Sequence, residues 1–271
     1  MSESSERGDL GQGHAGRTGT TRLLVTGGGS GLGAALVRAW RERGAEVLAT
    51  DAAEGADLRL DVRSDDDWAA AVGWVEDRWG GLDVLVNNAG VAGGGRIDVA
   101  TMDEWQWITE INLFGAVLGT RVFVPMMKRQ GSGLVVNVAS LAGLVHPAGM
   151  ASYNAVKAAV VAFTETMGHE LAAHGIRAAV VCPSYFRSNL MSSMRGRDSA
   201  LATVMSHLVD GSPTSADDVA AEVLAGLDRG EELILPDPAA RAAYRLKRED
   251  RKGYDATMRH QAAKLEELAG E

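Results

Sequence analysis

The segment ASYNAVKAAV, residues 151–160, places Tyr153 and Lys157 four positions apart in a stretch rich in helix-forming alanine. In a helix, side chains four positions apart lie on one face, one turn from each other. They are either an ordinary surface pair or an acid with the cation that tunes it. An isolated tyrosine, with a pKa of about 10, stays protonated at neutral pH. A nearby ammonium group favours the phenolate, which would make Tyr153 a usable base for an alcohol proton.

A glycine-rich segment, VTGGGSGLG at 25–33, lies between a short apolar run and a helical pattern. Gly27, Gly31 and Gly33 have the spacing G-x-x-x-G-x-G. Glycine allows a tight turn and lets backbone approach a pyrophosphate closely, and the following helix N-terminus supplies free N–H groups. A flexible turn would have the same composition, but the strand–turn–helix context favours a dinucleotide cofactor.

Asp51 indicates which dinucleotide to expect. It ends the next predicted strand, in VLATD. A carboxylate there can accept hydrogen bonds from both hydroxyls of the adenosine ribose and would repel a 2′-phosphate. Neither Ser30 of the loop nor Ala52 supplies a cation for such a phosphate. The sequence therefore predicts NAD rather than NADP.

The elements that must hold these residues alternate along the chain. Apolar runs rich in β-branched residues predict strands, and the stretches between them are helical in composition. Continuous apolar strands separated by helices are typical of a mostly parallel sheet with helices on both faces. We therefore predict a doubly wound, Rossmann-like α/β fold. The predicted strands are 22–26, 46–50, a short run within 56–62, 82–90, 133–140, 176–183 and 232–236. The predicted helices are 34–43, 65–79, about 102–129 (made uncertain by Gly115 and Pro125), one from about 151, and 217–230.

Length and composition bound the class of protein. A chain of 271 residues with a net charge of −9 predicts one catalytic domain over 21–236, without nucleic-acid or membrane partners and without a metal site. The single cysteine, Cys182, excludes a disulfide framework and favours the cytoplasm. Residues 1–20 predict a polar, disordered leader, since they lack the apolar region of a secretion signal. The charged segment 237–271 is either a docked helix or a frayed tail.

Taken together, these motifs resemble the short-chain dehydrogenase/reductase family over about residues 21–236. The resemblance depends on several motifs in the family's order, not on any one of them. They are the loop with Gly27, Gly31 and Gly33; Asp61-Val62 in LRLDV; NNAG at 87–90; Asn112 in INLFG; Ser140 in NVAS; and Tyr153 with Lys157.

The resemblance implies an NAD-dependent enzyme that interconverts a secondary alcohol and a ketone. In the family, the serine orients the substrate oxygen and the tyrosine moves its proton. The lysine tunes the tyrosine and holds the nicotinamide ribose, and the asparagine anchors a water in a proton relay. These roles fall on Ser140, Tyr153, Lys157 and Asn112. With the charges of the lysine and of NAD⁺, we expect the tyrosine pKa to fall by about 2 to 3.

The family also implies a homotetramer or homodimer through the helices at 102–129 and 150–173, and a set of cofactor contacts. The implied cofactor-binding residues are Gly27, Ser30, Gly31, Leu32, Gly33, Asp51, Asp61, Val62, Asn88, Ala89, Gly90, Tyr153, Lys157, Pro183, Phe186 and Ser188.

One segment departs from the family pattern. Where the family has Pro-Gly and then Thr, this chain has Pro183-Ser184 and Ser188, and Tyr185 and Arg187 make the pocket floor bulkier. The apolar residues of 189–210 predict either core packing or an adaptable Met-rich lid over an apolar substrate. His146 is either a loop residue or a contact for a polar substituent. The predicted substrate is an apolar small molecule, and its predicted pocket residues are Val145, His146, Met150, Tyr185 and Met191.

Two other functions fit the same fold. A nucleotide-sensing protein would bind the cofactor without turnover, but it would not need the proton relay. An NADP-dependent carbonyl reductase would keep the relay, and Asp51 argues against it.

Overall fold

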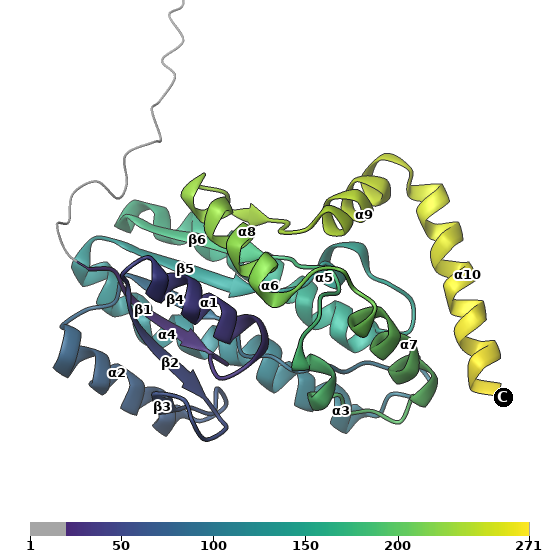
Figure 1. The fold of residues 1–271 in the computed structure, drawn as a ribbon, viewed down its shortest axis with the longest axis horizontal. Helices are drawn as coiled ribbons and strands as arrows, with labels where there is room; N and C mark the ends of the chain where they lie inside the picture. Colours follow the sequence, from purple (N-terminus) through teal and green to yellow (C-terminus); the bar gives the residue numbers. More distant parts are fainter. Residues whose placement is uncertain (1–19, 271) are drawn as a thin grey trace, which may run out of the picture.

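The computed structural model describes residues 20–270; apart from residue 20, the predicted leader lies outside this range. Its strands are β1 (Arg22–Thr26), β2 (Glu46–Asp51), β3 (Leu58–Arg59), β4 (Val84–Asn87), β5 (Gly133–Val138), β6 (Ile176–Val181) and β7 (Leu233–Ile234). They form one sheet in the order β3-β2-β1-β4-β5-β6-β7, in which every pair is parallel (Figure 1). The predicted doubly wound α/β fold is confirmed.

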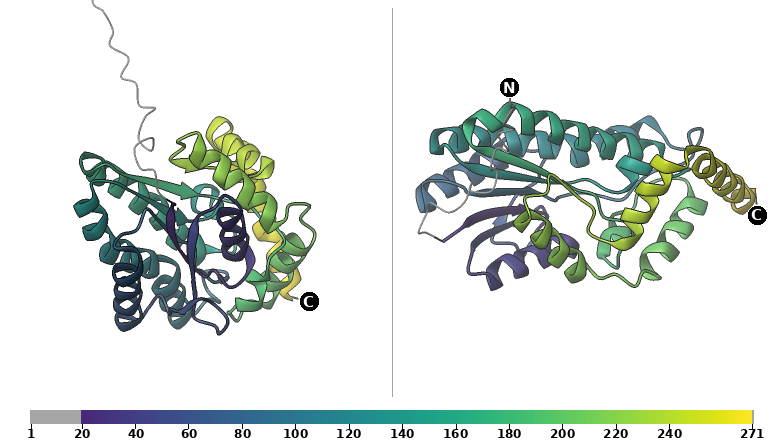
Figure 2. Two further views of the ribbon diagram at one scale, coloured as in Figure 1. Left: turned by 60° about the vertical axis from the view of Figure 1, so that its left-hand side comes forward. Right: turned by 90° about the horizontal axis from the view of Figure 1, so that it is seen from above.

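Helices cover both faces of this sheet, because strands that are apolar on both sides must be buried on both sides (Figure 2). The helices are α1 (Gly31–Glu42), α2 (Asp65–Trp79), α3 (Met102–Thr109), α4 (Gly115–Gln130), α5 (Ala142–Val145), α6 (Ala151–Leu171), α7 (Ser199–Asp210), α8 (Ala216–Asp228), α9 (Pro238–Glu249) and α10 (Arg251–Gly270). Residues of α1 and α8, such as Leu36 and Val223, share one buried cluster with the strands. Residues of α2, α4 and α6, such as Trp68, Phe123 and Met167, share another.

The first helix begins earlier than predicted, at Gly31 rather than at residue 34. The last glycines of the loop therefore form the first helical turn. The backbone N–H groups of this first turn, which have no partner within the helix, therefore lie in the glycine-rich segment itself.

The long predicted helix at 102–129 is interrupted, but not at its proline. Between α3 and α4 the chain makes a π-helical turn, η1 (Glu110–Phe114), whereas Pro125 lies inside α4 without ending it. Such widened turns are frequent at functional sites, and this one contains Asn112. By length and a mean hydropathy of 1.2, the run Met102–Gln130 also meets the criteria for a membrane span. Here α4 packs against β4 and β5 of the sheet.

The segment after Pro236 forms two docked helices, not a frayed tail. Asp237 accepts a hydrogen bond from the N–H of Ala240, and Pro238 occupies the first turn, so both residues favour a helix start there. A sharp turn at Asp250, which accepts from the N–H of Gly253, separates α9 from α10. The second helix then runs beside α7 at one end of the molecule (Figure 1).

Candidate active site

The loops that follow β1, β2, β4, β5 and β6 surround one cavity of about 800 Å³. The strand order reverses between β1 and β4, whose carboxyl ends open into this cavity. In open parallel sheets, ligands bind outside the carboxyl ends of strands at such a switch point.

The glycine loop has the close packing that a dinucleotide cradle requires. Gly27 has a φ of 63°, and a Cβ there would lie 2.9 Å from the Cα of Ala89. A Cβ on Gly33 would collide with the carbonyl oxygen of Gly27. Gly27 and Gly31 line the cavity, whereas Gly33 does not. The structure therefore places Gly33 in the contact between α1 and the loop, not against a ligand.

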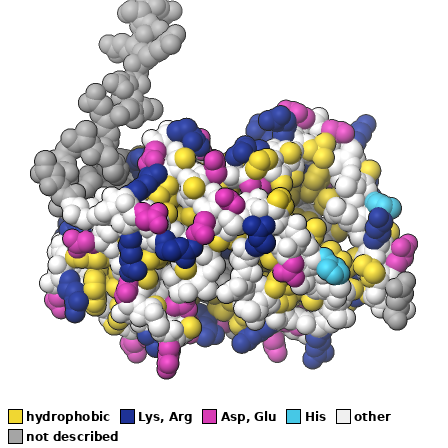
Figure 3. Space-filling view, in the orientation of Figure 1, with side chains coloured by type: hydrophobic (Ala, Val, Ile, Leu, Met, Phe, Trp, Pro, Cys, Tyr) yellow, Lys and Arg dark blue, Asp and Glu magenta, His cyan; other side chains and the backbone are white. Residues whose placement is uncertain are grey.

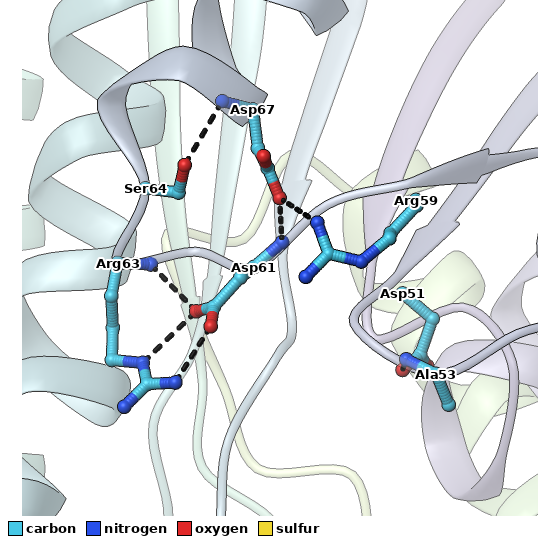
Figure 4. Close-up of polar contacts among 7 residues, drawn as sticks. All are labelled: Asp51, Ala53, Arg59, Asp61, Arg63, Ser64 and Asp67. Atoms are coloured by element: carbon cyan, nitrogen blue, oxygen red, sulfur yellow. Dashed lines mark hydrogen bonds and ion pairs between the residues drawn. The ribbon is translucent and has the colours of Figure 1, made fainter.

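Asp51, predicted to meet the adenosine ribose, lines the cavity. Its carboxylate accepts from the N–H of Gly29 at 3.1 Å and from that of Ala53 at 3.0 Å. Sequence reasoning missed its neighbour Arg59, which pairs with Asp51 across β2 and β3. The Arg59 guanidinium binds Asp67 at 2.9 Å (Figure 4). A cation thus lies beside Asp51 but is held by another acid.

Asp61 is also engaged within the chain. Arg63 donates from Nε and Nη2 to its two carboxylate oxygens, at 3.0 and 2.6 Å (Figure 4). The Arg63 hydrogen bond lowers the pKa of Asp61, so the carboxyl stays ionised. Both residues line the cavity, and any adenine at this end would meet an ion pair rather than a free carboxylate.

The other predicted cofactor contacts come together around the same space. Asn88, which follows β4, connects its loop to the glycine loop after β1, because its side-chain amide donates to the carbonyl oxygens of Thr26 and Gly27. The remaining predicted residues that line the cavity are Ser30, Leu32, Val62, Ala89, Gly90, Pro183, Phe186 and Ser188.

The predicted reacting groups meet at the cavity wall. Tyr153 lies in the first turn of α6, and Ser140 follows β5; both line the cavity. Lys157 lies one turn further, with its Nζ 5.8 Å from the tyrosine ring centroid. This Nζ donates to the carbonyl oxygen of Val138 at 3.0 Å. Helix α6 packs closely against α5, since a Cβ on Gly143 of α5 would lie 2.6 Å from the Lys157 carbonyl carbon.

The pKa of Tyr153 without a bound cofactor is set mainly by burial. Burial raises it to about 12, although the hydrogen bond with Ser140 acts in the opposite direction. Burial also lowers the pKa of Lys157 to about 8. The groups of this chain alone do not lower the tyrosine pKa, and the expected fall with NAD⁺ bound stays a prediction. The lysine is itself desolvated, so its charge does not offset the burial of the phenol.

Asn112 lies behind the cavity rather than in its wall. Its side chain accepts from the N–H of Val91 at 2.8 Å and donates to the Val91 carbonyl at 3.0 Å. A Cβ on Gly90 would lie 3.1 Å from the Asn112 Oδ1 and 3.6 Å from the Lys157 Nζ. The structure thus gives the asparagine side chain a positioning role, and its place in a water relay stays a prediction.

The substrate half of the cavity differs in part from the prediction. Val145, Met150 and Tyr185 line it, whereas His146 and Met191 do not. His146 contacts α9 instead, with Nδ1 2.6 Å from the Nζ of Lys247, and Met191 packs in a hydrophobic cluster beside the cavity. The segment 189–210 does contribute apolar side chains to the cavity wall, which are Leu190, Leu201, Val204, Met205, Leu208 and Val209. Within residues 20–270, no group of three or more His, Cys, Asp or Glu side chains is arranged to hold a metal ion.

A family model described as short chain dehydrogenase matches residues 21–198, more than half of the chain. The chain belongs to the short-chain dehydrogenase/reductase family. It is an oxidoreductase that acts on hydroxyl or carbonyl groups with a nicotinamide cofactor.

Curated relatives agree with this assignment. The chain is 39% identical to a 3-alpha-(or 20-beta)-hydroxysteroid dehydrogenase of Mycobacterium tuberculosis, over 61% of this chain and 68% of that one. It is 38% identical to a cis-4-hydroxycyclohexanecarboxylate dehydrogenase of Sinomonas cyclohexanicum, over 63% and 75%.

Solved structures share the fold but differ in cofactor. A Burkholderia phymatum member in complex with NAD has a TM-score of 0.79 and 29% identity, covering 85% of this chain and 94% of its own. A Burkholderia cenocepacia member in complex with NADP has a TM-score of 0.75 and 27% identity, covering 88% and 97%.

The match to the short-chain dehydrogenase model ends before the outer wall of the cavity begins. Beyond residue 198, the cavity is lined by α7, which lies in the segment 189–210 singled out from the sequence, and by α9 and α10, which were not among the predicted site residues. The available signal was the three- and four-residue spacing of lining positions in α10. Spacing alone did not show that this helix is docked.

Proposed function

We propose that this short-chain dehydrogenase/reductase interconverts a secondary alcohol and a ketone on an apolar small molecule, with NAD as cofactor and Tyr153 as the acid and base. The observation that carries the proposal is that Ser140, Tyr153 and Lys157 line one cavity wall, with the Lys157 Nζ 5.8 Å from the tyrosine ring centroid. The same cavity is lined by the carboxylates of Asp51 and Asp61 and by the apolar side chains of α7 and α10.

In this mechanism the Ser140 hydroxyl hydrogen-bonds the substrate oxygen and fixes it beside Tyr153. The tyrosine takes the alcohol proton during oxidation and returns a proton to the carbonyl oxygen during reduction. Lys157, one helical turn away, supplies positive charge next to the phenol. A bound nicotinamide would accept or give the hydride and, when oxidised, would add a second positive charge that favours the phenolate.

The class of substrate follows from the cavity lining. Aliphatic and aromatic side chains dominate the substrate half, so an apolar ring fits it better than a polar sugar or nucleotide. The hydroxysteroid and the hydroxycyclohexanecarboxylate named for the two relatives are alcohols on apolar rings and support this class.

The cofactor preference depends on Asp51. Its carboxylate lines the cavity and would repel a 2′-phosphate. Arg59 favours the alternative, an NADP-dependent carbonyl reductase, because it stands next to Asp51 in the sheet register. It is paired with Asp67, however, and this pairing supports NAD.

The test is oxidation of a panel of cyclic secondary alcohols, followed by the absorbance of reduced nicotinamide. The Tyr153→Phe variant should lose about a hundredfold or more in kcat/KM, the usual contribution of a positioned proton-transfer group. Tyr244→Phe is the matched control, since Tyr244 lies on α9 outside the cavity wall. Undiminished activity in Tyr153→Phe would refute the mechanism. Tight NAD binding without turnover across the panel would favour a nucleotide sensor.

The cofactor assignment has its own test. The ratio of kcat/KM for NAD to that for NADP should fall in Asp51→Asn, because the variant removes the charge that repels a 2′-phosphate. Glu54→Gln, in the exposed turn after β2, should keep the wild-type ratio. A wild-type preference for NADP, or an unchanged ratio in Asp51→Asn, would show that Asp51 does not select the cofactor.

A further inference from the structure

Helix α10 supplies the outer wall of the substrate half. Its lining positions recur every three or four residues, so they form one face of the helix. They are Tyr254, Met258, Gln261, Lys264, Leu265 and Leu268. Leu208 of α7 stands among the opposite lining residues, and hydrophobic side chains gather in the hollowed part of this end of the molecule (Figure 3).

Contacts near both ends of α10 fix this wall in place. The Tyr254 hydroxyl donates to the carbonyl oxygen of Val145 at 2.7 Å. Near the other end, Glu266 pairs with Arg96 at 2.8 Å. Leu265 is buried close to Gly149, where a Cβ would lie 2.6 Å from its Cδ2. Lys264 immediately precedes Leu265, so its backbone is held at the mouth of the cavity.

The charges of the cavity wall are divided unevenly between its two halves. Asp51 and Asp61 lie at the adenosine end, where Arg63 is paired with Asp61. Lys157 is buried and donates to Val138. Lys264 is the remaining charged lining residue, and within residues 20–270 it makes no ion pair or hydrogen bond. Among the described lining residues, no carboxylate faces the substrate half.

Two arginines in or beside the segment 189–210, Arg187 and Arg195, are engaged in contacts away from the cavity. Arg187 donates to the carbonyl oxygen of Ser212. Arg195 stacks on the ring of Trp107, 4.8 Å from its centroid. Neither lines the cavity. Lys264 is therefore the cation that a ligand in the substrate half would meet.

We propose that Lys264 binds an anionic group at the far end of the substrate, so that this enzyme acts on apolar hydroxy acids or keto acids rather than on neutral alcohols. This inference rests on the proposed function. The aliphatic stem of a lysine can lie along an apolar wall while its ammonium stays at the water boundary. An apolar ring would then fill the chamber with its hydroxyl at Tyr153 and a carboxylate at the mouth. Gln261, one turn earlier on the same face, adds an amide donor.

The test compares the binding of matched acids and esters by calorimetry, with the protein saturated by the nicotinamide cofactor that it binds. One pair is 4-hydroxycyclohexanecarboxylate and its methyl ester, and a longer pair is a hydroxysteroid with a carboxylate side chain and its methyl ester. In at least one pair the acid should bind about fivefold more tightly, the upper range for an exposed ion pair. Lys264→Met should abolish the difference in affinity, and added salt should weaken the binding of the acid but not that of the ester.

Lys252→Met is the control, since Lys252 is an exposed lysine of the same helix outside the cavity wall. It should keep the preference for the acid, whereas Lys264→Glu should reverse it. Equal binding of acid and ester in both pairs, or a preference that survives Lys264→Met, would overturn the proposal. Turnover of the same compounds separates the two hypotheses. An acid that binds through Lys264 but is never oxidised would refute the proposed reaction and leave the anion site standing.

Discussion

Replacing Lys157 with methionine should remove a pH dependence from the stability of the cofactor-free protein. The lysine is 4% exposed, and burial lowers its pKa from 10.5 to about 8. Between these two values the unfolded chain binds a proton that the folded protein does not. Stability therefore rises with pH over this range, because the cost of holding a buried ammonium disappears. Below about pH 8 the folded protein bears that cost in full.

The size of the effect follows from the two pKa values. Between about pH 7 and pH 10, the free energy of unfolding of the wild type should rise by about 2 to 3 kcal/mol relative to Lys157→Met. Urea unfolding of both proteins across this range measures it. Tyr153 and Cys182, whose pKa values burial raises to about 12, are present in both proteins and largely cancel in the difference. Parallel pH profiles for the two proteins would refute the argument.

Three further predictions test other parts of the structure. Gly33→Ala should lower NAD affinity by at least tenfold in a titration, because its Cβ would collide with the Gly27 carbonyl; unchanged affinity would mean that the loop can yield. Asp198→Asn should cost about 3 kcal/mol in urea unfolding, since the buried carboxylate pairs with Arg96 and caps α7; an unchanged midpoint would contradict this. Phe114→Glu should shift the proposed oligomer toward monomer in light scattering, because this exposed aromatic lies within the 102–130 helical run; a monomeric wild type would refute the assembly.

The sequence was sufficient for the fold and for the glycine loop because their constraints are local. Gly27 must adopt a positive φ, and the apolar run at 22–26 must be buried on both sides, so each motif predicts its own surroundings. The spacing of Tyr153 and Lys157 likewise fixes their common helical face. The order of such motifs along the chain was enough to predict both the fold and the family.

What the sequence could not predict depends on contacts between distant segments. Arg59 lies beside Asp51 only because a two-residue strand pairs in that register. The turn of His146 toward α9 depends on Lys247, and its φ of 58° shows that the backbone there is unusual for a residue other than glycine. The raised pKa of Tyr153 depends on burial from several elements, which the four-residue spacing does not report.

The anchoring of α5 by the last two helices has a consequence for the order of folding. The carbonyl oxygens of Leu144 and Val145 accept hydrogen bonds from Lys247 and Tyr254, which lie 103 and 109 residues further along the chain. Contacts of such long sequence separation are slow to form, because a large loop must close first. On the ribosome, the nucleotide-binding half can assemble while α10 is still being synthesised. We therefore expect the substrate chamber to be completed last, so that a newly made chain acquires its cofactor site before its selectivity.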